Sequence, residues 1–153
     1  MTGYNFTREE VLSKCMTVLE NKRIAIEREM DDMSESVNNE TKSSVGDKHE
    51  TARARMQAEQ ARLQKQLFEL RAQKEEFEKI KQLKREEKVT PGSLVVTDSG
   101  VFFVAIALGK LKLGQVFVQV ISVRSPFALK MHGLKCGEVF EMNGNTYSIR
   151  HIT

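Results

Sequence analysis

Apolar residues recur at alternating spacings of four and three through most of the first 80 positions. A first series runs through Leu12, Met16, Leu19, Ile26, Met30, Met33 and Val37. A second series runs through Met56, Leu63, Leu67, Leu70 and Phe77. Because this spacing keeps one stripe of a helix apolar, each series predicts a helix that packs along a coiled-coil seam.

The two apolar series mirror each other along the chain. The residue numbers of Leu12 and Phe77 sum to 89, and so do those of Met33 and Met56. Facing residues keep such a constant sum when a chain folds back on itself, with its midpoint here at 44–45. The sequence therefore predicts an antiparallel two-helix hairpin, whereas a continuous parallel dimer would not require this symmetry.

Polar residues interrupt the predicted seam at Arg23, Gln60 and Lys74. Polar side chains at seam positions can fix the register of the two helices, or extend from a thin seam into solvent. We expect these structural roles rather than binding of a partner.

The connection between the two helices, residues 38–51, is polar and holds three carboxylates, including Asp47 and Glu50. Gly46 suits the turn, because glycine adopts positive φ without strain. Asp47 can then cap the second helix, and Glu50 fits its first turn, where negative charge is favourable. Helix capping is therefore a sufficient structural explanation of these acids, beside any functional one.

The second part of the chain has the pattern of a small β-rich domain. Strands are predicted at 93–97, 101–108, 115–122, 138–142 and 146–152. Asn143-Gly144 is a typical hairpin turn. Ser125 followed by Pro126 is typical of a helix N-cap and first turn, and the short helix should end at Gly133. The expected result is a twisted antiparallel sheet with one short helix.

Composition supports a division into two parts. Residues 7–88 contain no proline, whereas residues 91–153 hold both prolines and seven of the nine glycines. We therefore expect an α+β protein with a coiled-coil hairpin over 1–88, whose tip lies near 40–50, and a compact domain over 89–153.

Charge and cysteine usage narrow the classes of function. Lys and Arg number 24 against 21 acids, so a net charge of +3 argues against a purely electrostatic nucleic-acid binder. Cys15 and Cys136 are far apart and lack metal-ligand spacing, which favours a reduced, cytoplasmic protein. The sequence contains no run of about 18 apolar residues, so it predicts no membrane span. His132 and His151 have no partners at catalytic or metal spacing, so we expect a binding protein rather than an enzyme. Because the predicted hairpin forms within one chain, we also expect a monomer.

Two motifs, together with the architecture, resemble the bacterial Gre transcript-cleavage factors. Residues 125–140, SPFALKMHGLKCGEVF, are similar to the Ser-Pro, Ala, Gly and Gly-acidic-Val pattern of that family. The matching positions are Ser125, Pro126, Ala128, Gly133, Gly137, Glu138 and Val139. At the tip, Gly46, Asp47 and Glu50 match the family's Gly-Asp-x-x-Glu. The resemblance spans nearly the whole chain.

The resemblance implies a concrete function. The C-terminal domain would have an FK506-binding-protein-like fold and would dock on RNA polymerase through the Ser125-Pro126 region. The coiled coil would enter the secondary channel of the polymerase. Asp47 and Glu50 would there help to hold a magnesium ion that the polymerase supplies, so that the polymerase cleaves the 3′ end of backtracked nascent RNA. The free protein would carry no cofactor.

The sequence also departs from the family pattern and leaves alternatives open. Lys48 and His49 separate the two tip acids, and Arg124 stands where Asp or Asn often precedes the Ser-Pro pair. One alternative is a Gre-like factor that occupies the channel and inhibits or regulates without cleavage. Another is a generic coiled-coil adaptor, which would need neither magnesium nor polymerase. A prolyl isomerase is disfavoured, because the domain is short and no catalytic pocket is evident.

Overall fold

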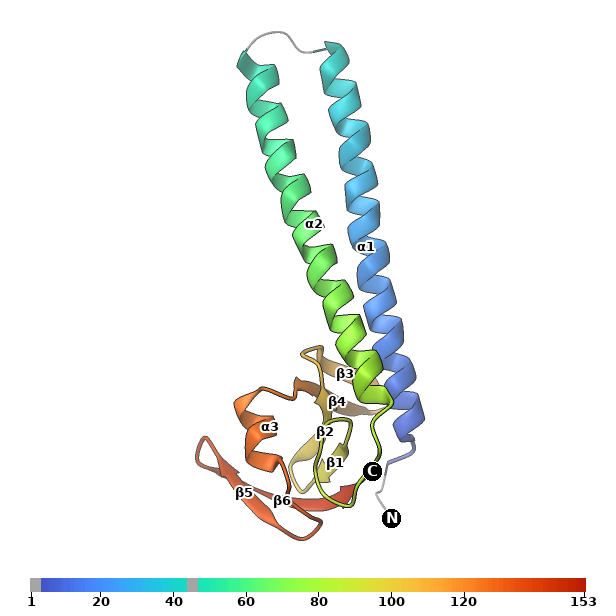
Figure 1. Cartoon of the computed structure of the whole chain (residues 1–153), viewed down its shortest axis with the longest axis vertical. Coiled ribbons are helices and arrows are strands. Elements are labelled where there is room, and N and C mark those ends of the chain that lie inside the picture. Colours follow the sequence, from blue (N-terminus) through green and yellow to red (C-terminus); the bar gives the residue numbers. More distant parts are fainter. Residues whose placement is uncertain (1–3, 44–46) are drawn as a thin grey trace. The chain divides into compact units, whose positions relative to one another are not determined.

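The structure is a computed structural model that describes residues 4–43 and 47–153, without the side chains of positions 36–43 and 47–49. Two long helices precede a six-stranded mixed sheet that carries one short helix (Figure 1). The helices are α1 (Arg8–Ser43), α2 (Asp47–Lys81) and α3 (Pro126–Met131). This confirms the α+β class.

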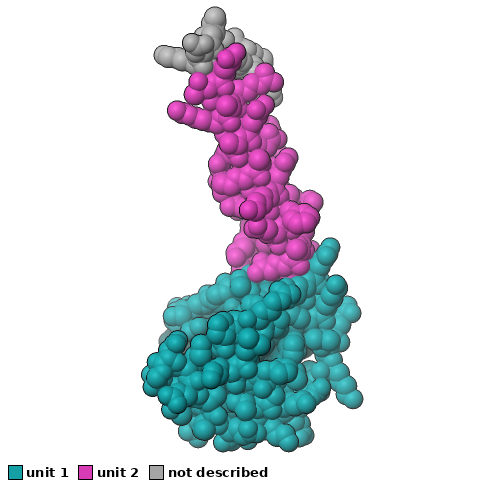
Figure 2. Space-filling view, turned by 60° about the vertical axis from the view of Figure 1, so that its left-hand side comes forward, with its two compact units in different colours: residues 1–16, 75–153 teal, residues 17–74 magenta. Residues whose placement is uncertain are grey.

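The chain divides into two compact units (Figure 2). Unit 2 is Thr17–Lys74 and contains most of the two long helices. Unit 1 combines Met1–Met16 with Glu75–Thr153, so that the first turns of α1 and the last turns of α2 belong with the sheet.

Helix α1 begins with a reciprocal capping box. The backbone N–H of Glu10 donates to Thr7 Oγ1 at 3.2 Å, and the N–H of Thr7 donates to Glu10 Oε2 at 3.1 Å. Two amides that would lack partners in the first turn are thereby satisfied. The local sequence therefore determines where this helix starts.

Within unit 2, α1 and α2 lie side by side and run in opposite directions (Figure 1). Leu19, Leu63 and Leu67 are buried in the seam, whereas Met33 and Met56 are half-buried. Charges also act between the two helices: the positive charge of Lys74 acts on Glu20, and the negative charge of Glu29 acts on Arg62.

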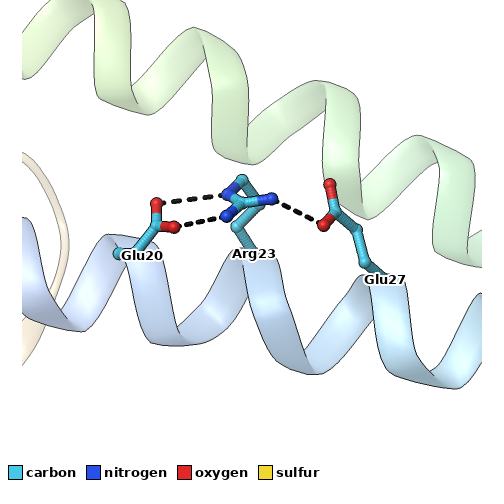
Figure 3. Close-up of polar contacts among 3 residues, drawn as sticks. All are labelled: Glu20, Arg23 and Glu27. Atoms are coloured by element: carbon cyan, nitrogen blue, oxygen red, sulfur yellow. Dashed lines mark hydrogen bonds and ion pairs between the residues drawn. The ribbon is translucent and has the colours of Figure 1, made fainter.

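Arg23, at a seam position of α1, finds its hydrogen-bond acceptors on the same helix (Figure 3). The guanidinium of Arg23 donates two hydrogen bonds to the carboxylate of Glu20, one of them at 3.1 Å, and a third to Glu27 at 2.5 Å. These contacts raise the pKa of Arg23 and lower that of Glu20. A pair of Glu59 and Arg62 repeats the arrangement on α2. Arg23 therefore occupies its seam position without a charged partner from α2.

The mirrored seam gives a prediction about α1 and α2. Cysteines replacing Met33 and Met56, in a Cys15→Ala, Cys136→Ser background, should be joined within one chain by a short bismaleimide. Helices in such a seam are about 8–10 Å apart, which this reagent can bridge. Mass spectrometry and gel mobility of the dilute protein distinguish an intrachain link from a dimer. A control with cysteines at Met33 and Lys74 should not link, and exclusive formation of dimers would contradict the hairpin.

Unit 1 is built on a sheet with strand order β3-β4-β2-β1-β6-β5. The strands are β1 (Leu94–Thr97), β2 (Gly100–Ala105), β3 (Gly109–Leu113), β4 (Val116–Ser122), β5 (Val139–Met142) and β6 (Asn145–Ile152). The hairpin between β5 and β6 turns at Asn143 and Gly144 with φ of 54° and 80°, which confirms the predicted turn.

The predicted all-antiparallel sheet is wrong in one respect, because β2 and β4 pair in parallel. The apolar pattern predicts one strand over 101–108, but β2 ends at Ala105. The chain then crosses over, turns at Gly109 with φ of 82°, and forms β3, which the apolar pattern does not predict. Strand β4 returns between β3 and β2, antiparallel to the first and parallel to the second.

Helix α3 covers one face of the sheet. Ala128 and Met131 are buried against Val95, Val104 and Ile149. The ring of Phe127 lies 4.5 Å from that of Phe102, measured between centroids. This aromatic and aliphatic core fixes the orientation of α3 on the sheet.

On a second side of unit 1, the start of α1 packs against the sheet through Arg8. This side chain is only 7% exposed, and its Nε donates to the carbonyl of Gly92 at 3.0 Å. Its guanidinium lies 5.9 Å from the centroid of the Phe103 ring. Desolvation, with the charge of Arg85, lowers the pKa of Arg8. These contacts tie the first turn of α1 to β2 and to the loop before β1.

Candidate functional site

The first candidate site is the end at which α1 and α2 are joined. Helix α2 begins at Asp47, and Glu50 lies in its first turn with an exposed side chain. Gly46 and the side chain of Asp47 lie outside the described residues. The role of the two acids therefore stays a prediction. Across the part of the chain that the structure describes, no group of three or more His, Cys, Asp or Glu residues could hold a metal ion.

The second candidate site is the start of α3, where Ser125 forms the predicted N-cap. Ser125 has extended backbone angles, and its Oγ accepts a hydrogen bond from the N–H of Ala128 at 3.2 Å. The same hydroxyl donates to the carbonyl of Ser122 at 2.7 Å. Pro126 fits the first helical position, where no N–H is required. The capping role is confirmed, whereas a role in partner binding stays a prediction.

Arg124, next to this cap, presents positive charge. Its side chain is 79% exposed and pairs with Glu76 near the end of α2, within unit 1, at 3.4 Å. Exposed pairs of this kind contribute little to stability. The sequence marks Arg124 as a departure from the family pattern but does not point to Glu76, because no local signal connects residues 48 positions apart.

Two exposed aliphatic side chains lie near α3. Leu129 is 64% exposed on the helix, and Val139 is 59% exposed on β5, the edge strand that packs beside α3. We call Arg124, Ser125 and Leu129 the α3 surface. Val139 is not part of it, because the adjacent Phe140 is the residue of β5 that packs against the aromatic ring of α3, and successive side chains of a strand face opposite sides. Single exposed aliphatic residues are common. Leu129 here accompanies the positive charge of Arg124, a combination that suits contact with another protein.

The thiols and imidazoles do not form a catalytic group in the described residues. Cys15 is fully buried, and burial raises the pKa of its thiol to about 12. Cys136 is exposed, and its Sγ donates to the carbonyl of Arg150 at 2.8 Å. His132 is exposed in the turn after α3, and His151 is exposed on β6.

The fold places the chain among α+β proteins in which a pair of long helices precedes a mixed sheet. In comparisons with known proteins, no family model and no curated protein matches the chain. Within the described ranges, no helix has the length and apolar character that crossing a membrane requires.

The N-cap can be tested separately from any binding role. Ser125→Ala should lower the free energy of unfolding by about 1 kcal/mol, because the N–H of Ala128 loses its acceptor. Ser125→Thr should retain most of the stability, since its hydroxyl can still accept from the N–H of Ala128 and donate to the carbonyl of Ser122. Urea unfolding followed by circular dichroism measures both. Equal stability of the alanine variant and the wild type would show that the cap contributes nothing.

Proposed function

We propose that this protein is a Gre-like transcription factor that binds RNA polymerase and acts through its helical hairpin in the secondary channel. Its C-terminal domain, which we propose to be FK506-binding-protein-like, would dock on the polymerase. The tip acids, Asp47 and Glu50, would then support the polymerase's own cleavage of backtracked RNA.

The observation that carries the proposal is the position at which α2 begins. The helix starts at Asp47 and leaves Glu50 exposed in its first turn, at the joined end of the two long helices. Acids three positions apart on a helix lie on neighbouring parts of its surface. A slender hairpin is also the shape of element that a narrow channel accepts. The matches to the family's tip and Ser-Pro motifs add to this support.

The proposed chemistry is that of two-metal phosphodiester hydrolysis. Magnesium prefers six oxygen ligands in octahedral geometry and usually takes one or two carboxylates beside water and phosphate. Asp47 and Glu50 would complete the ligand shell of a magnesium ion that the polymerase and the RNA already hold. An ion held in this way would stabilise the attacking and leaving oxygens, and the protein would contribute ligands and position.

The α3 surface is the proposed docking site on the polymerase. Leu129 would supply apolar contact, and Arg124 would favour an acidic partner surface. Leu129→Glu in the full chain should weaken binding to core polymerase at least about tenfold, as expected for a central apolar contact. Leu83→Glu, the same change at an exposed leucine in the segment that follows α2, serves as the matched control. Unchanged affinity of the Leu129 variant would remove α3 from the docking site.

The proposed function is tested with a stalled, backtracked elongation complex and labelled RNA. Addition of the wild-type protein should accelerate release of short 3′ fragments in the presence of magnesium. The sequence provides a reason for a second candidate function: Lys48 and His49 stand between the two acids and can compete for them. Binding to the polymerase with slower cleavage than in the protein's absence would establish this inhibitory function. Absence of any binding would leave the adaptor alternative.

A further inference from the structure

Charge is distributed unevenly between the two parts of the sequence. Residues 89–153 contain six Lys and Arg against three Asp and Glu, a difference of +3, which equals the net charge of the whole chain. Within them, positions 99–137 contain no acid at all. This stretch covers β2, β3, β4 and α3. Its five basic residues are Lys110, Lys112, Arg124, Lys130 and Lys135.

An exposed aromatic residue lies inside this acid-free stretch. Phe117 of β4 is 50% exposed. The Nζ atoms of Lys110 and Lys112, both on the edge strand β3, lie 5.1 Å and 6.0 Å from the centroid of its ring. The register of β3 and β4 sets Lys112 opposite Phe117 and Lys110 opposite Gln119. One aromatic ring, two ammonium groups and an amide therefore share one exposed face; we call these four residues the β3–β4 patch.

Packing of the sheet does not require an aromatic residue at position 117. Side chains alternate between the two faces of a strand, and β4 buries Val118 and Val120 while it exposes Phe117 and Gln119. Lysines on an edge strand have a structural explanation, because they oppose pairing with another sheet edge. That explanation accounts for Lys110 and Lys112. It does not account for the exposed ring of Phe117 on β4, the strand that lies between β3 and β2.

We propose that the β3–β4 patch binds single-stranded nucleic acid. A base would stack on the ring of Phe117, and the two lysines would contact the adjoining phosphates. Aromatic rings with nearby cations are the usual means of binding single strands without strict sequence preference, because every base offers a π face. Positions 99–137 contain no acid, so this stretch itself contributes no negative charge that would repel the phosphates. This inference does not depend on the proposed function.

The test is fluorescence anisotropy of the full-length protein with labelled single-stranded oligonucleotides of about 12 nucleotides, within the usual size of such sites. Oligo-uridine and oligo-thymidine distinguish RNA from DNA as the source of the strand. Phe117→Ala should weaken binding about tenfold, from loss of one stacked base. Phe117→Trp should retain affinity, whereas Phe117→Leu, which keeps an apolar contact without a π face, should lose it.

The lysines have a separate readout in the salt dependence of binding. Lys110→Gln and Lys112→Gln should each reduce the slope of log affinity against log salt concentration by about 0.7, the value for one phosphate contact on a single strand. Phe68→Ala is the matched control, because Phe68 of α2 is the other strongly exposed phenylalanine among the described residues. Circular dichroism should show the same fold for every variant.

Several results would overturn the inference. Absence of saturable binding to either oligonucleotide would do so, and so would equal affinities of the wild type and Phe117→Leu. A larger loss with Phe68→Ala than with Phe117→Ala would locate the site on α2 instead. Equal competition by polyglutamate and by an unlabelled single strand would show general attraction of polyanions. None of these measurements contains polymerase, so their failure is distinguishable from failure of the proposed function.

Discussion

Replacement of both tip acids, Asp47→Asn together with Glu50→Gln, is expected to abolish stimulated cleavage of backtracked RNA. Each single change should reduce it sharply. The amide groups keep the size of the side chains and can still accept hydrogen bonds, but they no longer offer the charged oxygen ligand that magnesium prefers. The rate of release of 3′ fragments from a stalled complex, at saturating factor, measures the effect.

Two further measurements make this experiment decisive. Binding of the double variant to core polymerase and its thermal unfolding should equal those of the wild type, because Glu50 is exposed and the proposed docking site is the α3 surface. Lys48→Gln is the matched control at the same turn and should not lower cleavage, because Lys48 is not a proposed ligand. Full activity of the double variant would leave Asp47 and Glu50 with helix capping alone.

The second large effect concerns the two thiols. Cys15 should react with iodoacetamide at least about a thousandfold more slowly than Cys136 in the folded protein at pH 8. Burial raises the pKa of Cys15 from 9.0 to about 12, so the fraction of Cys15 that is present as the reactive thiolate falls by about three powers of ten. Complete burial also excludes the reagent. Peptide mass spectrometry over time gives both rates, and in urea the two rates should converge.

The same buried thiol makes stability depend on alkaline pH. The pKa of Cys15 is higher in the folded state, so below about pH 9 both states keep the proton and its contribution is constant. Between pH 9 and 12 the unfolded state loses the proton first, and the free energy of unfolding falls by about 1.4 kcal/mol per pH unit. Cys15→Ala should remove this part of the decline. Rapid alkylation of Cys15 in the folded protein would contradict the burial of its side chain.

Local chemistry explains the parts of the fold that the sequence predicts well. Thr7 and Glu10 satisfy each other's amides, and Ser125 caps α3 through its own hydroxyl, so short windows of sequence are sufficient. Asn143-Gly144 accepts the positive φ values that its hairpin requires. The mirrored apolar series likewise encodes two helices through a regular repeat.

The features that the sequence did not reveal depend on contacts between distant residues. The apolar run 101–108 gives no sign that the strand ends at Ala105 and that the chain crosses to the sheet edge. Parallel pairing of β2 with β4 follows from that crossover. The burial of Arg8 against Gly92 joins positions 84 apart, and a charged residue in a first helical turn ordinarily predicts exposure.

At the candidate sites, the same distinction holds. The motif around Ser125 predicted the cap, but the neighbouring pair of Arg124 and Glu76 required the fold. The exposure of Phe117 could not be predicted, because Phe117 lies in an apolar strand and alternation alone does not say which set of side chains faces solvent. A window that counts acids would have separated 99–137 from the rest of the chain.

The ion pairs of Arg23 affect how the two long helices can separate. Both of its partners, Glu20 and Glu27, belong to α1, so a local opening of the seam breaks neither pair. An ion pair across the seam would leave a charge without its partner at each opening, and added salt would then change the opening equilibrium. At the level of Arg23, opening therefore separates apolar contacts and the Lys74–Glu20 charge attraction across the seam, but none of the ion pairs of Arg23. Amide hydrogen exchange there should respond to temperature and denaturant, and salt should act only through the attraction between Lys74 and Glu20.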